Sequence, residues 1–193
     1  MFLRWCDALR LRSVQQIFID LYGSRLATIA AIEAHSPAGG CLLAMSCDYR
    51  VMANDEKFKI GLNETNLGIA APYWLCDLFV RTIGFREAET GLALAKLYNP
   101  QEALKVNLVD ELHPQGEIID RATEHAIRWA KIPPTARASG KLNLRQPFID
   151  TLVENREKDI ENFCNFILTD QVQKSLDKYM EALSSKGGKK EKK

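Results

Sequence analysis

The stretch that most limits how this chain can fold is RLATIAAIEAHSPAGGCLLAMSCDYRVMA, residues 25–53. Residues 25–34 form a short apolar run with β-branched side chains, which is typical of a buried strand. The proline and glycines of HSPAGG indicate a loop, and the apolar residues 39–45 predict a short buried helix. A second strand is predicted in CDYRVMAND, closed by the turn signal Asn54-Asp55. This close succession of strand, loop, helix and strand predicts an α/β core.

Helical patterns dominate the rest of the chain. KFKIGLNE predicts a third short strand that enters a loop at Gly61, and VDELHP predicts a further short strand. Prolines punctuate the later helices, and we expect Pro147 to separate two of them. The expected helices cover residues 71–83, 85–97, 100–106, 115–131, 135–146, 148–168 and 170–184.

Three parts follow from this pattern. We predict an α/β core over residues 1–132, a helical C-terminal domain over residues 133–185 and a disordered basic tail over residues 186–193, where KGGKKEKK clusters lysines. The N-terminal MFLRWCDALRLRSVQQIF is basic and amphipathic, as transit peptides are. Asp7, scarce serine and an unbroken pattern into IDLYGS favour a structural helix that ends at Gly23-Ser24.

Composition excludes several classes of function. The chain has 193 residues, 46% of them hydrophobic and 26% charged, which suits a globular protein with one sizeable core. A formal net charge of +1 gives no field that recruits nucleic acid. No apolar run approaches the roughly 18 residues of a membrane span.

Cysteine and histidine usage argues against disulfides and metals. The five cysteines are scattered without a CxxC pair, which favours reduced thiols. The three histidines lie far apart, so we predict no metal ion. No GxGxxG or Walker-type phosphate loop occurs, and we predict no cofactor. The residues concerned are Cys6, Cys41, Cys47, Cys76, Cys164, His35, His113 and His125.

The Gly-Gly turn is the first candidate for chemistry. Glycines between a strand and a helix let the backbone approach a ligand because no Cβ intervenes. The first N–H groups of a helix lack internal partners, and the helix dipole adds partial positive charge there. The turn is therefore a candidate site for an anion or for an oxygen on which negative charge develops. A Gly-Gly pair that serves only as a tight turn is the alternative.

Glu64, in the loop KIGLNETNLGI, is the second candidate. If Leu62, Leu67 and Ile69 enclose its carboxylate, burial raises its pKa above the usual value of roughly 4.3. A raised pKa makes a stronger base for an acidic C–H proton. An exposed loop glutamate is the alternative. Because one strand pair joins the two stretches, we expect a backbone donor to face a lone carboxylate across one pocket.

The order of these motifs resembles the crotonase, or enoyl-CoA hydratase/isomerase, superfamily, and within it the mitochondrial 3,2-trans-enoyl-CoA isomerases. The resemblance extends from about Leu21 to Leu183. It rests on SPAGGCLLAMSCDYRVMA, IGLNETNLGIAAPYWL, TIGFREAETGLAL, PQEALKVNLVDELHP and FILTDQVQKSLDKYMEAL.

The resemblance implies a crotonase-like fold of stacked β-β-α units, only partly contained in this chain, with a helical C-terminal domain that helps to close the acyl pocket. It implies an acyl-CoA thioester with a double bond as substrate, a homotrimer or larger assembly, and the mitochondrial matrix as location. By resemblance, Gly39 supplies one N–H to the thioester oxygen, Glu64 is the catalytic glutamate, and Asn63 contacts substrate.

Leu42 bears on the reaction. In hydratases the corresponding stretch resembles GGCE, so that a second glutamate stands where this chain has Leu42. Two carboxylates there share the work of adding water to the double bond. A single base suffices to move a proton from C2 to C4 through an enolate. Leu42 neither gives nor takes a proton, and it keeps the pocket dry. We therefore predict an enoyl-CoA delta isomerase of β-oxidation of unsaturated fatty acids.

The sequence departs from the family pattern at two places. The resemblance implies an upstream SAG-x-D-type loop with the second oxyanion N–H, and residues 1–193 contain no such motif. We therefore expect an N-terminally truncated member with a lower rate. Ala34 stands where the resemblance predicts glycine. The alternative function is a non-catalytic subunit that acts in oligomer assembly or acyl-CoA binding; a hydratase is a third option, which Leu42 argues against.

Overall fold

The computed structural model describes residues 8–187. Residues 1–7 and 188–193 lie outside this part, and with them Cys6, the start of the expected N-terminal helix and most of the expected basic tail. Within residues 8–187, fifteen elements follow one another, and two of them are single 3₁₀ turns, η2 (Glu64–Leu67) and η3 (Gln115–Glu117). The α-helices are α1 (Ala8–Tyr22), α2 (Gly39–Ser46), α3 (Tyr73–Ile83), α4 (Phe85–Ala93), α5 (Pro100–Lys105), α6 (Ile118–Ala130), α7 (Pro134–Ile167) and α8 (Asp170–Gly187).

Two small parallel sheets form the centre of the molecule. One has the strand order β1-β3-β5, with Ile29 opposite Tyr49 and Val51 opposite Glu111. The other pairs β2 with β4. Parallel neighbours need a crossover connection, which α2 supplies between β1 and β3. The strands are β1 (Ile29–Ile32), β2 (Ser36–Pro37), β3 (Tyr49–Ala53), β4 (Ile60–Gly61) and β5 (Glu111–His113).

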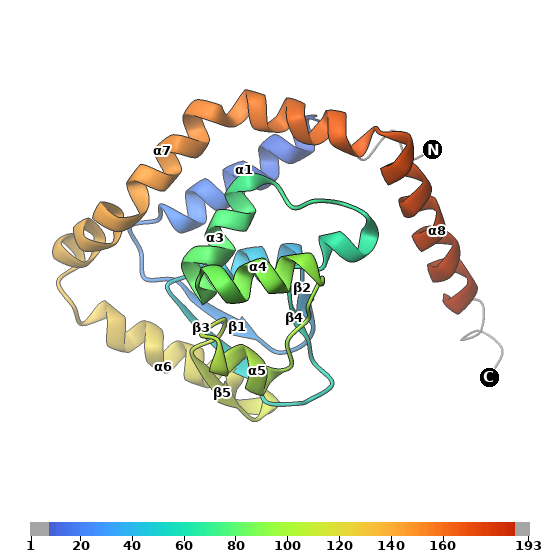
Figure 1. Cartoon of the computed structure of the whole chain (residues 1–193). Coiled ribbons are helices and arrows are strands. Elements are labelled where there is room, and N and C mark those ends of the chain that lie inside the picture. Colours follow the sequence, from blue (N-terminus) through green and yellow to red (C-terminus); the bar gives the residue numbers. More distant parts are fainter. Residues whose placement is uncertain (1–7, 188–193) are drawn as a thin grey trace.

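Helices surround these sheets. In Figure 1, α7 arches over the molecule beside α1, α6 lies below the three-stranded sheet, and α8 descends at one side. The apolar core joins α1, α2, α3 and the sheet strands. Phe18 of α1 is fully buried and its ring lies 5.0 Å from that of Trp74 on α3. This aromatic contact holds α1 and α3 against the core.

Most predicted elements are confirmed, and several are shorter than expected. The strand expected over residues 25–34 is β1, and the buried helix expected over residues 39–45 is α2. The strand expected in KFKIGLNE is only the two residues of β4. HSPAGG, expected to be a loop, contains β2. No helix crosses the division expected near residues 132–134, because α6 ends at Ala130 and α7 begins at Pro134.

The predicted helix break at Pro147 is wrong. α7 continues through this residue. Proline removes one backbone donor, so the carbonyl of Asn143 loses its helical partner. Both residues are exposed, and water can satisfy that carbonyl. Phe148 and Ile149, next in sequence, are 5% and 4% exposed, and this packing outweighs the local preference.

Candidate active site

The turn that leads into α2 is fixed against the strand that precedes the glutamate loop. Ser36 donates its N–H to the Lys59 carbonyl at 2.8 Å, and Ala38 donates to the Gly61 carbonyl at 2.8 Å. These bonds extend the pairing of β2 with β4. The two stretches predicted to share a pocket are therefore joined by a backbone ladder.

Gly39 begins α2, and its surroundings are open. A Cβ built at this residue would meet no atom within 4 Å. Its N–H is one of the first four of the helix, which have no intrahelical acceptor. The preceding residue, Ala38, has φ 49° and ψ −111°, a conformation that costs a non-glycine residue about 1–3 kcal/mol. Strain of this kind concentrates at functional sites. This strain could not be predicted from the sequence, because alanine is not a residue type that indicates a positive φ.

Glu64 opens η2 with a carboxylate that is largely removed from water. Its Oε2 is buried and has no hydrogen-bond partner among the described residues. Burial raises the pKa of Glu64, and a hydrogen bond from its own backbone N–H opposes that rise. The sequence left open whether Glu64 is enclosed or exposed; in the structure it is partly buried, and its pKa is raised.

Two thiols locate the carboxylate between helices. Burial, and secondarily the charge of Glu64, raises the pKa of Cys41 on α2. The same two causes raise the pKa of Cys76 on α3. The carboxylate therefore lies within electrostatic range of both helices. Leu62, which was expected to enclose the Glu64 carboxylate, is buried at 1% exposure. The two thiols could not be predicted from the sequence, because the packing of α2 and α3 brings them near Glu64.

Two glycines allow the backbone of this loop its close contacts. Gly61 has φ +146°, and a Cβ there would lie 2.6 Å from the Lys96 carbonyl oxygen. Gly68 has φ +75°, and a Cβ there would lie 2.7 Å from the Cβ of Ser175 on α8. α8 is thus packed directly on the glutamate loop. A small apolar cluster secures this contact; it comprises Ile167, Val172 and Leu176 with Ile69 and Phe163.

The other predicted site residues lie close by in the chain. Leu42 is 5% exposed and follows Cys41 on α2. Asn63 immediately precedes η2, is partly buried, and makes no side-chain capping bond. Ala34 is exposed and is not among the residues with positive φ, so the backbone there does not require glycine.

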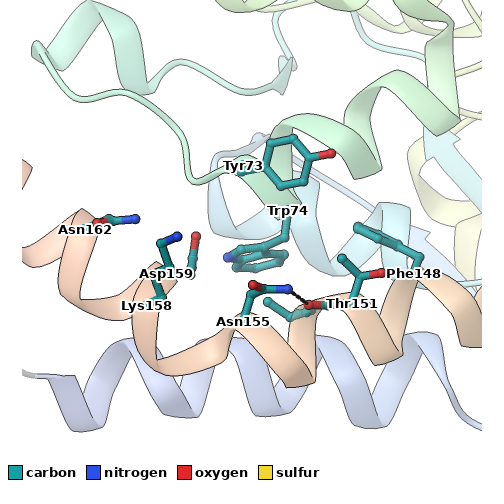
Figure 2. A pocket seen from close by; sticks show the side chains of 9 residues that line it. Tyr73, Trp74, Phe148, Thr151, Asn155, Lys158, Asp159 and Asn162 are labelled. Atoms are coloured by element: carbon teal, nitrogen blue, oxygen red, sulfur yellow. Dashed lines mark hydrogen bonds between the residues drawn. The ribbon is translucent and has the colours of Figure 1, made fainter.

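A separate groove of about 370 Å³ lies between α3 and α7 (Figure 2). Trp74 of α3 is 4% exposed and faces the α7 side chains, where Asn155 Nδ2 donates to the Thr151 carbonyl at 2.8 Å. Asp159, at the same groove, accepts a hydrogen bond from Gln15 Nε2 of α1 at 2.8 Å. Neither Glu64 nor the α2 turn lines this groove.

Within residues 8–187, no cluster of three His, Cys, Asp or Glu side chains is arranged to hold a metal ion. None of the four described cysteines forms a disulfide within residues 8–187. None of the helices in this part of the chain combines the length and apolarity that crossing a bilayer requires. The groups that the Glu64 loop and the α2 turn offer are a desolvated carboxylate and a helix N-terminus.

Fold and site together define an α/β protein in which a carboxylate with a buried, unpartnered Oε2 lies in a loop that a backbone ladder joins to the turn before α2. A desolvated carboxylate can remove an acidic C–H proton, and the N–H groups of a helix N-terminus can stabilise the resulting charge. A sequence profile of the enoyl-CoA hydratase/isomerase family matches residues 6–188. The chain belongs to this family, and the crotonase-type α/β fold expected from the sequence is confirmed.

Individual relatives agree with this assignment. The chain is 48% identical over 177 residues to "Enoyl-CoA delta isomerase 1, mitochondrial" of Mus musculus, covering 92% of this chain and 61% of that protein. The Homo sapiens protein of the same name is 43% identical over 177 residues, covering 92% and 59%. The crystal structure of human mitochondrial delta3-delta2-enoyl-CoA isomerase superposes with a TM-score of 0.89 at 41% identity, covering 93% of this chain and 71% of that chain.

Proposed function

We propose that this chain is an enoyl-CoA delta isomerase, which shifts the double bond of a 3-enoyl-CoA to the 2-trans position in β-oxidation of unsaturated fatty acids. The observation that carries the proposal is the buried Glu64 carboxylate, whose Oε2 has no partner among the described residues. The names of the mouse and human relatives support it. The chain spans 61% of the length of the mouse relative.

The proposed reaction needs one base and one oxyanion donor from this chain. The Glu64 carboxylate takes a proton from C2, and the electrons of that C–H bond form an enolate on the thioester oxygen. The Gly39 N–H stabilises this charge, a contribution typically worth about 3–4 kcal/mol per donor. The protonated Glu64 then delivers its proton to C4 as the double bond moves to C2=C3. Asn63 would contact the substrate beside this base.

Leu42 accounts for isomerisation in preference to hydration. Its buried side chain offers no proton and no anchor for water. We expect the chain to convert a 3-enoyl-CoA into the conjugated 2-trans thioester with no 3-hydroxyacyl-CoA, as separated and quantified by chromatography. Hydrated product in an amount comparable with the 2-trans isomer would contradict this role of Leu42.

A non-catalytic role is the second candidate, and the groove between α3 and α7, which neither Glu64 nor the α2 turn lines, favours it. On this reading the chain binds acyl-CoA or assembles with other subunits without turnover. Calorimetry with a saturated acyl-CoA, alongside the isomerisation assay, separates the two functions. Saturable binding without turnover supports the non-catalytic role, and turnover of the 3-enoyl-CoA excludes it.

Location and assembly complete the proposal. The relatives named mitochondrial support a place in the mitochondrial matrix. We also propose a homotrimer or larger assembly. Large apolar side chains on the described surface support an interface, among them Leu26 at 71% and Leu144 at 79% exposure. Light scattering should give a mass at least three times that of one chain, and a monomer mass would contradict the assembly.

A further inference from the structure

A cavity of about 500 Å³ lies where the C-terminal half of α6 meets the start of α7. Its volume lies within the range of small-molecule sites. It lies at the start of β3, and neither Glu64 nor Gly39 lines it. The lining residues are Tyr49, His125, Arg128, Trp129, Ile132 and Arg137.

Two arginines line this cavity; Arg128 also lines an adjoining cavity with Glu111 and Glu124, and Arg137 lines another with Asp48. Neither Arg128 nor Arg137 forms an ion pair within residues 8–187, and no Asp or Glu lines the cavity. The Nε and Nη1 atoms of Arg137 are buried and have no hydrogen-bond acceptor among the described residues. Because a guanidinium is always charged, burying it without an acceptor is costly. A bound anion would remove this cost.

The carboxylate beneath the cavity is already engaged by other groups. Glu111 accepts hydrogen bonds from the Tyr49 hydroxyl at 2.9 Å and from Nε2 of both His113 and His125 at 3.0 Å. Burial alone would raise the pKa of Glu111, but these bonds bring it to about 2. The negative charge of Glu111 is therefore engaged by Tyr49, His113 and His125. Arg128 and Arg137 form no ion pair among the described residues.

Aromatic rings form an apolar wall beside the arginines. The Tyr49 ring stacks on His125 with 4.3 Å between centroids, and it lies 6.3 Å from the ring of Trp129. Ile132 is 52% exposed at the mouth. The Nδ1 atom of His125 is buried without a partner among the described residues. The wall suits the body of a small organic molecule, and the arginines suit its charged end.

We propose that this cavity binds a small organic oxyanion, whose phosphate or carboxylate group pairs with Arg128 and Arg137 and whose apolar body lies against Trp129. This site is independent of the proposed isomerase site. Arginine is suited to both acids because its planar donors match phosphate and carboxylate oxygens.

Titration calorimetry of the full chain with phenyl phosphate, benzoate and phenol tests the proposal. We expect saturable binding of at least one of the two anions and none of phenol, which carries the ring without the charge. The tighter anion identifies the acid group. Arg128→Gln should weaken binding about tenfold or more, because a hydrogen bond to a charged group is lost. Arg137→Gln should weaken it similarly.

Two further variants separate this site from general charge effects and from the isomerase site. Arg121→Gln removes the same charge nearby from a residue already paired with Glu124 at 3.0 Å, so affinity should stay within about twofold. Glu64→Gln should also leave affinity unchanged. Absence of saturable binding by both anions overturns the proposal. Equal affinity in wild type and the exposed Arg128→Gln variant, or equal binding of phenol, overturns it as well.

Discussion

Ionising Glu64 costs free energy because its Oε2 leaves water and gains no donor in return. The folded-state pKa of Glu64 lies above the value of 4.5 for the free side chain. The unfolded state therefore ionises more readily, and this difference lowers stability as the pH rises above 4.5 through the folded pKa. The carboxylate is kept at the expense of stability, as is common at functional sites.

We predict that Glu64→Gln raises the melting temperature at neutral pH, because the amide has no charge to desolvate. The gain should disappear as the pH falls below about 4, where the carboxylate is protonated in both states. Thermal unfolding followed by circular dichroism from about pH 3 to pH 8 measures this gain. Glu154→Gln, an exposed change on α7, should show no such pattern. A Glu64→Gln variant that melts below wild type at neutral pH would contradict the prediction.

Local patterns singled out the Glu64 loop and the Gly-Gly turn, and the resemblance to crotonases supplied the roles expected for Glu64 and Gly39. A glutamate in an apolar loop and a glycine at a helix start are readable without distant contacts. The thiols of Cys41 and Cys76 were beyond reach because the packing of α2 and α3 brings them to Glu64. The strain at Ala38 was equally hidden, since it depends on the pairing of β2 with β4.

At the scale of single elements, β4 depends on a glycine. We predict that Gly61→Ala destabilises the fold by about 2 kcal/mol or more, because the new Cβ meets the Lys96 carbonyl and φ is unfavourable. Gly39→Ala, whose Cβ meets nothing within 4 Å, should change stability by no more than about 0.5 kcal/mol. Urea unfolding of the two variants gives the comparison. Equal losses of stability in the two variants would show that the backbone relieves the crowding at residue 61 without an energetic cost.

α7 shows why an element boundary was misread. Pro147 predicts a break from local chemistry alone, and two of its neighbours are buried apolar residues that pack the helix onto the core. The burial of Phe148 and Ile149 outweighs the single lost hydrogen bond. The strand and helix order of the core was readable because its apolar runs are short and bounded by glycine, proline and asparagine.

At the scale of the whole molecule, one aspartate ties α7 to the sheet. Asp48, at 3% side-chain exposure, forms ion pairs with Lys141 Nζ at 2.9 Å and with Arg145 Nη1 at 3.0 Å. The Thr28 N–H donates to its second oxygen at 2.9 Å. These bonds join α7 to the residues that precede β1 and β3. Such a contact between distant segments leaves no local trace in the sequence.

We predict that Asp48→Asn lowers the free energy of unfolding by about 3–5 kcal/mol, because two buried cations lose their counter-charge. Asp150→Asn removes an exposed carboxylate from α7 itself and should cost less than about 0.5 kcal/mol. Chemical denaturation of both variants measures the difference. A loss for Asp48→Asn no larger than that for Asp150→Asn would show that the ion pairs do not hold α7 in place.

The isomerisation rate of the Glu64→Gln variant tests the proposed function most directly. Conversion of a 3-enoyl-CoA to the 2-trans thioester is followed by absorbance for wild type and variant at equal concentrations, with folding confirmed by circular dichroism. We predict that wild type catalyses the conversion and that kcat falls at least about 100-fold in the variant, because an amide cannot accept the C2 proton. A wild-type chain without turnover, or a variant within twofold of an active wild type, would contradict Glu64 as the base of an isomerase.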